Sequence, residues 1–365
     1  MSVLLVAGAR PNFMKIAPIE RALAEAGHET VIVHTGQHYD DRMSDAFFRD
    51  LELRKPDRNL GVGSASHAVQ TARIMEAFEP VLLETRPDWV LVPGDVNSTI
   101  ACALVTVKLK EETGSRLAHL EAGLRSRDWR MPEEVNRVLT DRCADLLLIP
   151  SRDAVDNLRE EGIPEERIAF IGNVMIDALL RRLPRAREMD RPGAMGLERG
   201  GYVLSTLHRP SNVDRKEDLT TALTALGTVA REMPVVIPLH PRTRKQVERH
   251  GLEELLEPLT VTEPLGYLDM LSVMDGAAVV LTDSGGIQEE TTALGIPCVT
   301  LREQTERPIT IEEGTNRLVA WPLTVEGVLA SFEEARAEGR AGVGERSPEG
   351  WDGETARRTV EALEG

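Results

Sequence analysis

The chain has 365 residues, of which 41% are hydrophobic and only 4% are aromatic. This composition is typical of a soluble globular α/β protein, excludes a disordered chain and makes two domains the first expectation. Lys and Arg number 43 against 60 Asp and Glu, a formal net charge of −17. Such a balance argues against nucleic acid or an anionic membrane as a partner, so an anionic ligand needs a local basic pocket.

Three cysteines (Cys102, Cys143 and Cys298) lie in apolar contexts without CxxC spacing. They indicate buried thiols in a reducing cytosol rather than a disulfide framework or a zinc site. The apolar part of the N-terminus is too short for a signal peptide. No window approaches ~18 continuous apolar residues, so we expect a cytoplasmic protein with no membrane span.

In the first half of the chain, short apolar runs alternate with helical patterns. The runs VLLVA, WVLV and LLLI are apolar on both faces, as expected for parallel strands that helices cover on both sides. This pattern predicts a doubly wound α/β sheet. The predicted strands are 3–7, 30–34, 89–93, 117–120, 146–149 and 168–171, and the predicted helices are 14–26, 41–51, 68–85, 99–111, 134–143 and 152–161.

The pattern breaks over residues 183–201, where Pro, Arg, Gly and Met replace periodic apolar residues. We interpret this segment as a linker or exposed insertion. A second sheet then follows, and we expect both sheets to direct their loops into a shared cleft, because open α/β sheets bind ligands beyond the carboxyl ends of their strands. Its predicted strands are 202–207, 235–239, 260–262, 278–282, 298–301 and 318–321, with helices 216–232, 243–248, 267–274, 287–294, 325–338 and 354–363.

Each informative motif directly follows a predicted strand. GARPNFMK, after the first strand, places Arg10 and Lys15 near a helix start, where they could bind a diphosphate. The alternative is a pair of solvated charges. Asp95 in GDVNST follows a glycine and precedes the residues that would cap the next helix, so we interpret it as catalytic rather than as a cap.

Two further acidic motifs follow. Glu121 in HLEAGLRS lies where a buried strand meets its loop, a position that favours an acid or base with a raised pKa. The alternative is a structural pair between Glu121 and Arg125. In MPEEVNR, Glu133 and Arg137 are four residues apart in the first turns of a helix, which by itself would be an ordinary helix pair.

The second half adds basic loops and a glycine-rich turn. STLHRPSN and PLHPRTR place His208 and His240 after two strands. In LTDSGGIQEE a strand leads into a glycine-rich turn and a helix start, which is a ready anion site, yet two carboxylates follow within the helix. A nucleotide diphosphate reconciles them if the turn faces the phosphates and Glu290 accepts hydrogen bonds from the ribose. Capping and solvent exposure are the default interpretations of Asp283 and Glu289.

Together the cations, the amide-lined turn and the carboxylates suit a nucleotide sugar. The GxGxxG fingerprint of a nicotinamide cofactor and the GxxxxGK[ST] loop of an ATPase are both absent from the sequence. No HExxH motif or cysteine cluster supports a metal. We therefore predict an enzyme that needs no cofactor.

These residues resemble the non-hydrolysing UDP-N-acetylglucosamine 2-epimerases. The resemblance implies the GT-B fold, here with Rossmann-like domains at 1–175 and 176–353 and helix 354–365 packing back on the first. It also implies a cytoplasmic homodimer that takes a UDP-sugar and uses no metal. The matching segments run in order over about residues 1–320 and are GARPNFMKIAPI, TGQHYD, VPGDVNST, HLEAGLRS, MPEEVNR, TLHRPSN, LHPRTR, LTDSGGIQEE and QTERP.

The resemblance further implies a reaction and a set of site residues. C2 loses its proton and UDP leaves, which gives 2-acetamidoglucal; a proton then returns to the opposite face and UDP re-adds at C1. Asp95, Glu121 and Glu133 match the acid–base residues, with the face on which each acts left open, and His208 matches a histidine near the diphosphate. The matched substrate-binding positions are Arg10, Lys15, Arg137, Ser284, Gly285, Gly286, Glu290 and Arg307.

The chain departs from many bacterial members at the allosteric site for a second UDP-N-acetylglucosamine. Gln37, Arg73 and His240 match that site, but Tyr39, Asp40, Pro210 and Ser211 replace residues of the family pattern. We therefore expect epimerisation without this activator. The alternatives are a 2-epimerase of a related UDP-sugar such as UDP-2,3-diacetamido-2,3-dideoxyglucuronic acid, which Arg242 and Arg244 could recognise, a hydrolysing epimerase, a GT-B glycosyltransferase and a non-catalytic regulator.

Overall fold

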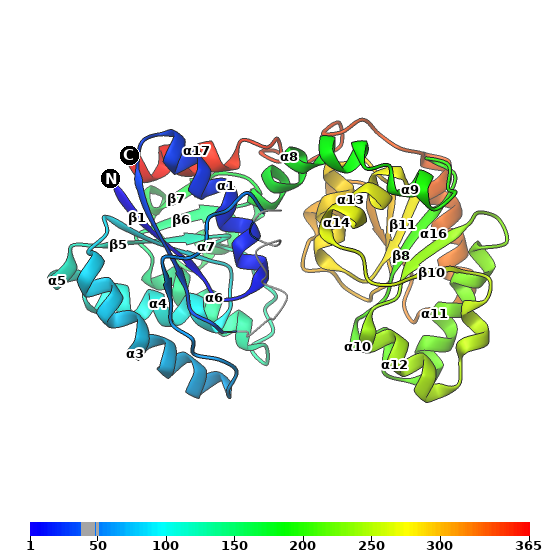
Figure 1. The fold of residues 1–365 in the computed structure, drawn as a ribbon, viewed down its shortest axis with the longest axis horizontal. Coiled ribbons are helices and arrows are strands. Elements are labelled where there is room, and N and C mark those ends of the chain that lie inside the picture. Colours follow the sequence, from blue (N-terminus) through cyan, green and yellow to red (C-terminus); the bar gives the residue numbers. More distant parts are fainter. Residues whose placement is uncertain (38–47, 49–50) are drawn as a thin grey trace. The chain divides into compact units, whose positions relative to one another are not determined.

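The structure is a computed structural model that describes residues 1–37, 48 and 51–365. The chain divides into two compact units, the first formed by Met1–Ala178 with Glu349–Gly365 and the second by Leu179–Pro348 (Figure 1). Each unit is a parallel sheet covered by helices. Most of the helix expected over 41–51 and the allosteric-site positions His38, Tyr39 and Asp40 lie outside the described residues.

The sheet of the first unit has the strand order β3-β2-β1-β4-β5-β6-β7, and all neighbouring strands are parallel. The order reverses between β1 and β4, so the loops after these two strands diverge at the position where open sheets bind ligands. The two-residue strand β3 was not predicted. The strands are β1 (Ser2–Ala7), β2 (Glu29–His34), β3 (Arg58–Asn59), β4 (Trp89–Pro93), β5 (Arg116–Leu120), β6 (Leu146–Ile149) and β7 (Ile168–Phe170).

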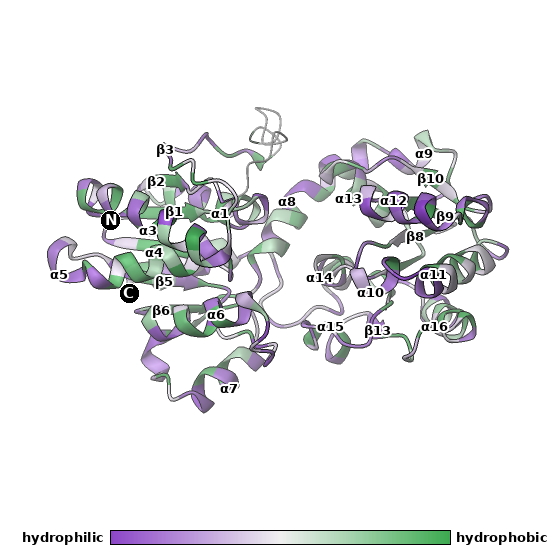
Figure 2. Ribbon diagram, turned by 90° about the horizontal axis from the view of Figure 1, so that it is seen from below, coloured by the Kyte–Doolittle hydropathy of each residue, from purple (hydrophilic) through white to green (hydrophobic). Residues whose placement is uncertain are grey.

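Helices cover both faces of this sheet because its central strands are apolar on both faces. Along β1, Val3 and Leu5 pack in one core cluster while Leu4 and Val6 pack in another, as the alternation of a strand requires. In Figure 2 helix α4 has hydrophobic colours, consistent with its buried position. The helices are α1 (Arg10–Glu25), α3 (His67–Thr85), α4 (Asn97–Lys108), α5 (Lys110–Thr113), α6 (Pro132–Cys143), α7 (Asp153–Glu160) and α17 (Thr355–Glu364), with a 3-10 turn at Glu165–Arg167.

Helix α17 joins the first unit from the far end of the chain. It packs beside α1 (Figure 1), and the Trp89 indole donates a hydrogen bond of 2.9 Å to the Leu363 carbonyl. The Asp177 carboxylate accepts from the backbone N–H groups of Thr355 and Ala356 at 3.1 and 2.7 Å. A carboxylate at a helix N-terminus satisfies amides that have no partner inside the helix.

The second unit repeats the architecture with the strand order β10-β9-β8-β11-β12-β13, again all parallel. Here the order reverses between β8 and β11. The strands are β8 (Val203–Thr206), β9 (Val235–Pro238), β10 (Thr260–Thr262), β11 (Val279–Thr282), β12 (Cys298–Thr300) and β13 (Asn316–Leu318). The helices are α10 (Pro210–Val213), α11 (Lys216–Val229), α12 (Pro241–His250), α13 (Tyr267–Gly276), α14 (Gly285–Ala293), α15 (Ile309–Glu312) and α16 (Val325–Glu338), with a 3-10 turn at Glu253–Leu256.

The segment 183–201, expected as a linker or exposed insertion, is mostly exposed, but much of it is helical rather than irregular. Helix α8 (Val174–Glu188) runs into it, and α9 (Arg191–Ala194) follows. Ile176, Leu179 and Leu183 are buried at helical spacing, but Pro184 and the surrounding charges obscure this pattern in the sequence. A proline inside a helix removes one hydrogen bond and crowds the preceding turn, yet α8 continues through Pro184 to Glu188.

Two smaller expectations are also settled. Cys102 and Cys298 are buried free thiols, as predicted, whereas Cys143 is only half-buried. Within the part of the chain that the structure describes, no helix combines the length and the apolar character needed to span a bilayer.

Candidate active site

A partly buried ion pair lies at the carboxyl ends of β1, β4 and β5. The Lys15 ammonium, from the first turns of α1, is 2.5 Å from the Glu121 carboxylate, and the two side chains are only 16% and 12% exposed. Glu121 has a backbone φ of +67°, which is uncommon for a residue with a side chain. Gly94, with φ of +66°, leaves room for the amine, since a Cβ there would lie 3.2 Å from Lys15 Nζ.

A second ion pair lies after β4. The Arg137 guanidinium contacts Asp95 at 2.5 Å and also bonds Glu134. Glu134 is 1% exposed and accepts from the backbone N–H groups of Ser126 and Arg127 at 3.0 and 2.8 Å. Burial raises the pKa of Glu134, but these hydrogen bonds and the charge of Arg137 together hold it below its ordinary value.

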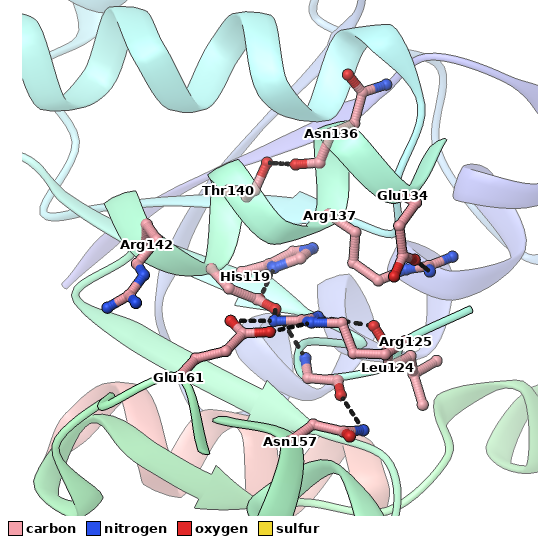
Figure 3. Close-up of polar contacts among 12 residues, drawn as sticks. His119, Leu124, Arg125, Glu134, Asn136, Arg137, Thr140, Arg142, Asn157 and Glu161 are labelled. Atoms are coloured by element: carbon pink, nitrogen blue, oxygen red, sulfur yellow. Dashed lines mark hydrogen bonds and ion pairs between the residues drawn. The ribbon is translucent and has the colours of Figure 1, made fainter. Parts of the chain in front are cut away.

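The pairing of Glu133 with Arg137 is therefore wrong. Glu134, one residue later, takes the arginine, and Figure 3 shows the two side chains together. The Glu133 side chain is partly exposed and makes no hydrogen bond or ion pair to any residue that the structure describes. The two glutamates point about 100° apart on the helix, so a helix that begins at Pro132 turns one inward and leaves the other accessible to a ligand.

The alternative pairing of Glu121 with Arg125 is also wrong. Arg125 instead bonds Asp141 at 2.7 Å and Glu161 at 2.6 Å (Figure 3). Asp141 in turn contacts His119. Burial raises the pKa of Asp141, and the neighbouring charges and hydrogen bonds of His119 and Arg125 outweigh it, so the net direction is downward. Glu121 thus stays available at the site with Lys15.

Gln37 is part of the packing around the same edge. It is 5% exposed, and its side-chain oxygen accepts from the Ser98 N–H and hydroxyl at 2.9 and 2.6 Å. Its backbone carbonyl accepts from Gln70 at 2.8 Å. Gln37 therefore connects the end of β2 to the start of α4.

Two arginines of this unit lie nearer the surface. Arg73 is exposed on α3, and Arg10 is partly exposed at the start of α1.

In the second unit, a buried carboxylate holds the loop after β8. Asp283 is 0% exposed, and it accepts from the backbone N–H groups of His208 and Arg209 at 2.9 and 2.8 Å and from Asn212 at 3.1 Å. His208 Nδ1 also lies 2.8 Å from it. Burial raises the pKa of Asp283, and these contacts more than offset that effect and lower it. Sequence reasoning left Asp283 as a cap because its partners are more than 70 residues away.

The start of α14 has open space beside Gly286. Ser284 is the N-cap, and its N–H donates to the Thr282 hydroxyl at 3.0 Å. A Cβ added at Gly286 would meet no described atom within 4 Å. Packing within the unit therefore does not require glycine here, whereas close approach of a ligand to the helix amides would.

Further along α14, Glu290 is a partly buried carboxyl with an altered titration. Burial raises its pKa to about 7, and Glu289 adds to this rise. Tyr267, on α13, lies close enough to Glu290 to lower the pKa of that carboxyl, but burial outweighs this effect. Solvent exposure was the expectation for Glu289, and it is wrong. The Glu289 side chain is 13% exposed and bonds Arg307 at 2.8 Å.

The basic residues that follow β9 are engaged in contacts at the surface. His240 caps α12 by accepting from the Arg242 N–H at 3.2 Å, and its ring lies 5.8 Å from that of His208. Arg242 pairs with Asp214 at 2.6 Å and Arg244 with Glu263 at 2.7 Å. Of the two interpretations of these arginines, exposed charges at a helix start describe them better.

Comparison with known proteins agrees with the motifs. Residues 21–364 match the family described as UDP-N-acetylglucosamine 2-epimerase. The UDP-N-acetylglucosamine 2-epimerase of Methanococcus maripaludis is 41% identical over 322 residues, 86% of each chain. The UDP-2,3-diacetamido-2,3-dideoxy-D-glucuronate 2-epimerase of Pseudomonas aeruginosa is 44% identical over 339 residues, 91% of this chain and 92% of that one.

A solved structure extends the likeness to the fold. The crystal structure of the Methanocaldococcus jannaschii UDP-GlcNAc 2-epimerase in complex with UDP-GlcNAc and UDP matches with a TM-score of 0.84 at 38% identity, covering 100% of this chain and 99% of that chain. The predicted GT-B fold of two Rossmann-like domains is thereby confirmed. The chain belongs to the UDP-N-acetylglucosamine 2-epimerase family.

Proposed function

We propose that the protein is a non-hydrolysing UDP-N-acetylglucosamine 2-epimerase, which interconverts UDP-N-acetylglucosamine and UDP-N-acetylmannosamine. The observation that carries the proposal is the pair of carboxylates, Asp95 and Glu121, at the ends of the neighbouring strands β4 and β5, each held by one basic side chain. Carboxylates in this setting can take and return the C2 proton. The relatives named above support the substrate class.

The proposed reaction balances within the substrate. A carboxylate removes the C2 proton while the bond between C1 and the β-phosphate oxygen breaks, and the electron pair leaves with UDP. The products are 2-acetamidoglucal and UDP. The reverse steps place a proton on the opposite face of C2 and rejoin UDP to C1. We assign the proton transfers to Asp95, Glu121 and Glu133, the last because it is partly exposed at the start of α6.

The C2 proton is not acidic, so stabilisation of the departing diphosphate must lower the barrier. We assign this role to the amides of Ser284, Gly285 and Gly286 at the start of α14, with Glu290 on the ribose hydroxyls. His208, held by Asp283 at 2.8 Å, is assigned to the diphosphate. The remaining basic groups assigned to substrate are Arg10, Lys15, Arg137 and Arg307.

Proton NMR in deuterated water tests the proposal. The expected result with UDP-N-acetylglucosamine is deuterium at C2 together with the appearance of UDP-N-acetylmannosamine. Release of free sugar with an equal amount of UDP would instead show a hydrolysing epimerase. Glu121→Gln is the matched variant, since it keeps the shape of the side chain and removes its basicity.

A second candidate substrate is UDP-2,3-diacetamido-2,3-dideoxyglucuronic acid, which the 44% identity to the Pseudomonas aeruginosa enzyme favours. The carboxylate of this sugar would need a cation of its own. Arg242 and Arg244 pair with Asp214 and Glu263 at the surface, and a sugar carboxylate would have to replace these partners. C2 exchange with this sugar and none with UDP-N-acetylglucosamine would reverse the assignment.

We also propose that the enzyme is a cytoplasmic homodimer, as the family resemblance suggests. Sedimentation equilibrium should give twice the chain mass of 40.2 kDa. A mass that stays at that of one chain at micromolar concentration would contradict this assignment.

A further inference from the structure

A fully buried histidine of the first unit lies close to the loops that carry Asp95 and Glu121. His119 is on β5, two residues before Glu121, and is 0% exposed. Its Nδ1 is 2.6 Å from the Asp141 carboxylate on α6, and its Nε2 is 2.7 Å from the Gly94 carbonyl. Gly94 directly precedes Asp95. His119 therefore joins the carboxyl end of β4 to α6.

The two partners determine where the ring protons are. A backbone carbonyl can only accept, so Nε2 must carry a proton. The other oxygen of Asp141 accepts from the Gly123 N–H at 3.1 Å and from Arg125 at 2.7 Å. Donors and a positive charge stabilise the ionised form of a carboxylate, which leaves Nδ1 to donate as well. A ring that donates from both nitrogens is an imidazolium.

The surrounding charges balance such a cation. Arg125, whose side chain is 4% exposed, bonds Glu161 at 2.6 and 2.9 Å as well as Asp141, and Figure 3 shows the Arg125 guanidinium beside Glu161. The row thus contains two positive and two negative groups. Arg167 adds a hydrogen bond of 3.3 Å to the Asp141 carbonyl. A buried charge in a paired and hydrogen-bonded row avoids most of the penalty that a lone buried charge suffers.

We propose that His119 is a buried imidazolium that positions the catalytic loop by fixing the carbonyl of Gly94. The Gly94 N–H donates to the Leu120 carbonyl at 2.9 Å, so both backbone groups of Gly94 are held by β5. Asp95 directly follows Gly94 in the sequence, and Glu121 directly follows Leu120. The positioning role rests on the proposed epimerase function, whereas the protonation state of the ring does not.

Nitrogen NMR of the intact protein, with ¹⁵N in the histidine rings, tests the protonation state. We expect both ring nitrogens of His119 to carry protons at pH 7.5, with the signals assigned by their loss in His119→Asn. In Asp141→Asn the new amide donates to Nδ1, so that nitrogen should lose its proton while Nε2 keeps its bond to Gly94. An unprotonated Nδ1 in the wild type would overturn the imidazolium.

C2 exchange tests the positioning role. A misplaced catalytic group slows a reaction by roughly 100-fold, so His119→Asn should lose about that much kcat. UDP affinity should stay within about twofold, because the helix amides and the ribose contact assigned to UDP lie in the second unit and His119 contacts none of the basic groups assigned to substrate. Asp141→Asn keeps the Gly94 hydrogen bond and should lose less than about tenfold. Arg159→Ala, which removes exposed ion pairs on α7, is the control and should exchange normally.

The outcomes separate the two proposals. Wild-type exchange in a folded His119→Asn variant would overturn the positioning role. If His119→Asn does not fold, Asp141→Asn decides, because a 100-fold loss there would show that the hydrogen bond to Gly94 is not sufficient. If the wild type exchanges no C2 proton, the proposed reaction and the positioning role fall together, while the ring NMR still decides whether the imidazolium exists.

Discussion

At the scale of single residues, the raised pKa of Glu290 favours a role in nucleotide binding over a role in folding. Its pKa in the folded chain is raised to about 7 from the ordinary 4.5, mainly by burial. As the pH rises, the Glu290 carboxyl ionises in the unfolded chain before it ionises in the folded chain. Its contribution to the free energy of unfolding is therefore fully present below pH 4.5 and is lost as the pH rises through 7. A ribose that donates hydrogen bonds to the ionised form would offset the loss.

Glu290→Gln tests this coupling. Near pH 8.5 the variant should be more stable than the wild type, with a Tm higher by about 2–4 °C, because it buries no charge; near pH 4.5 the two should unfold together. UDP should bind the variant roughly tenfold more weakly, as expected for loss of a charged hydrogen-bond acceptor. Calorimetry measures both quantities. A wild type whose UDP affinity does not rise relative to Glu290→Gln between pH 6 and pH 8 would contradict the assignment.

The Glu121→Gln variant should separate proton transfer at C2 from binding of UDP. Glu121→Gln retains the left-handed turn and a hydrogen-bond acceptor for Lys15, but it cannot take a proton. We expect C2 exchange to fall by roughly 10²–10⁴-fold with UDP affinity unchanged. Stopped reactions analysed by NMR give the rate, and titration calorimetry gives the affinity. Equal losses in both would show that Glu121 binds the nucleotide instead.

The sequence identified the loops better than it identified the individual contacts within them. Asp95 and Glu121 were predicted as site residues because acidic groups at strand ends share one edge of a parallel sheet. Choosing between Glu133 and Glu134 as partner of Arg137 required the rotational phase of α6, which one residue changes by about 100°. The partners of Arg125 lie 16 and 36 residues away, beyond what local spacing can indicate.

At the scale of elements, α14 is the clearest candidate for phosphate binding. Gly286→Ala adds a Cβ that meets nothing within 4 Å in the unit, and alanine favours a helix over glycine by up to about 1 kcal/mol. The variant should therefore be at least as stable as the wild type. Its UDP affinity should nevertheless fall about tenfold or more, because the methyl group occupies the space in front of the amides. Unchanged UDP affinity, measured by calorimetry, would exclude this helix start.

Most strands were predicted within one or two residues, since apolar β-branched runs bounded by glycine and proline are strong local signals. The failures have physical causes. Strand β3 has two residues and pairs with β2, so it is too short to show a pattern of its own. The last strand, expected at 318–321, lies at Asn316–Leu318 because pairing with β12 sets its register. Pro184 concealed α8 in the same way that a helix end would.

At the scale of the whole molecule, activation by a second UDP-N-acetylglucosamine is the first property to test. Gln37 matches a residue of that allosteric site but is buried against Ser98 and Gln70, which gives it a structural role. We predict that UDP-N-acetylmannosamine is epimerised from time zero without added UDP-N-acetylglucosamine. Progress curves that show a lag, removed by a trace of UDP-N-acetylglucosamine, would contradict the prediction.

The two units should also differ in what stabilises them. Leu363 on α17 is 0% exposed and completes a core cluster made mostly by the first 180 residues. Leu363→Ala should therefore destabilise the first unit by about 2–5 kcal/mol. UDP, assigned to α14, should stabilise the second unit by about 2.7 kcal/mol at 100 times its Kd.

Differential scanning calorimetry can separate these effects. We expect two transitions, of which Leu363→Ala lowers one and UDP raises the other. Glu361→Ala is the matched control, because Glu361 is exposed on the same helix and pairs with Arg357, an interaction worth less than about 1 kcal/mol. A single transition that both changes move would show that the units unfold together, and α17 would then stabilise the nucleotide site through the cooperativity of the whole chain.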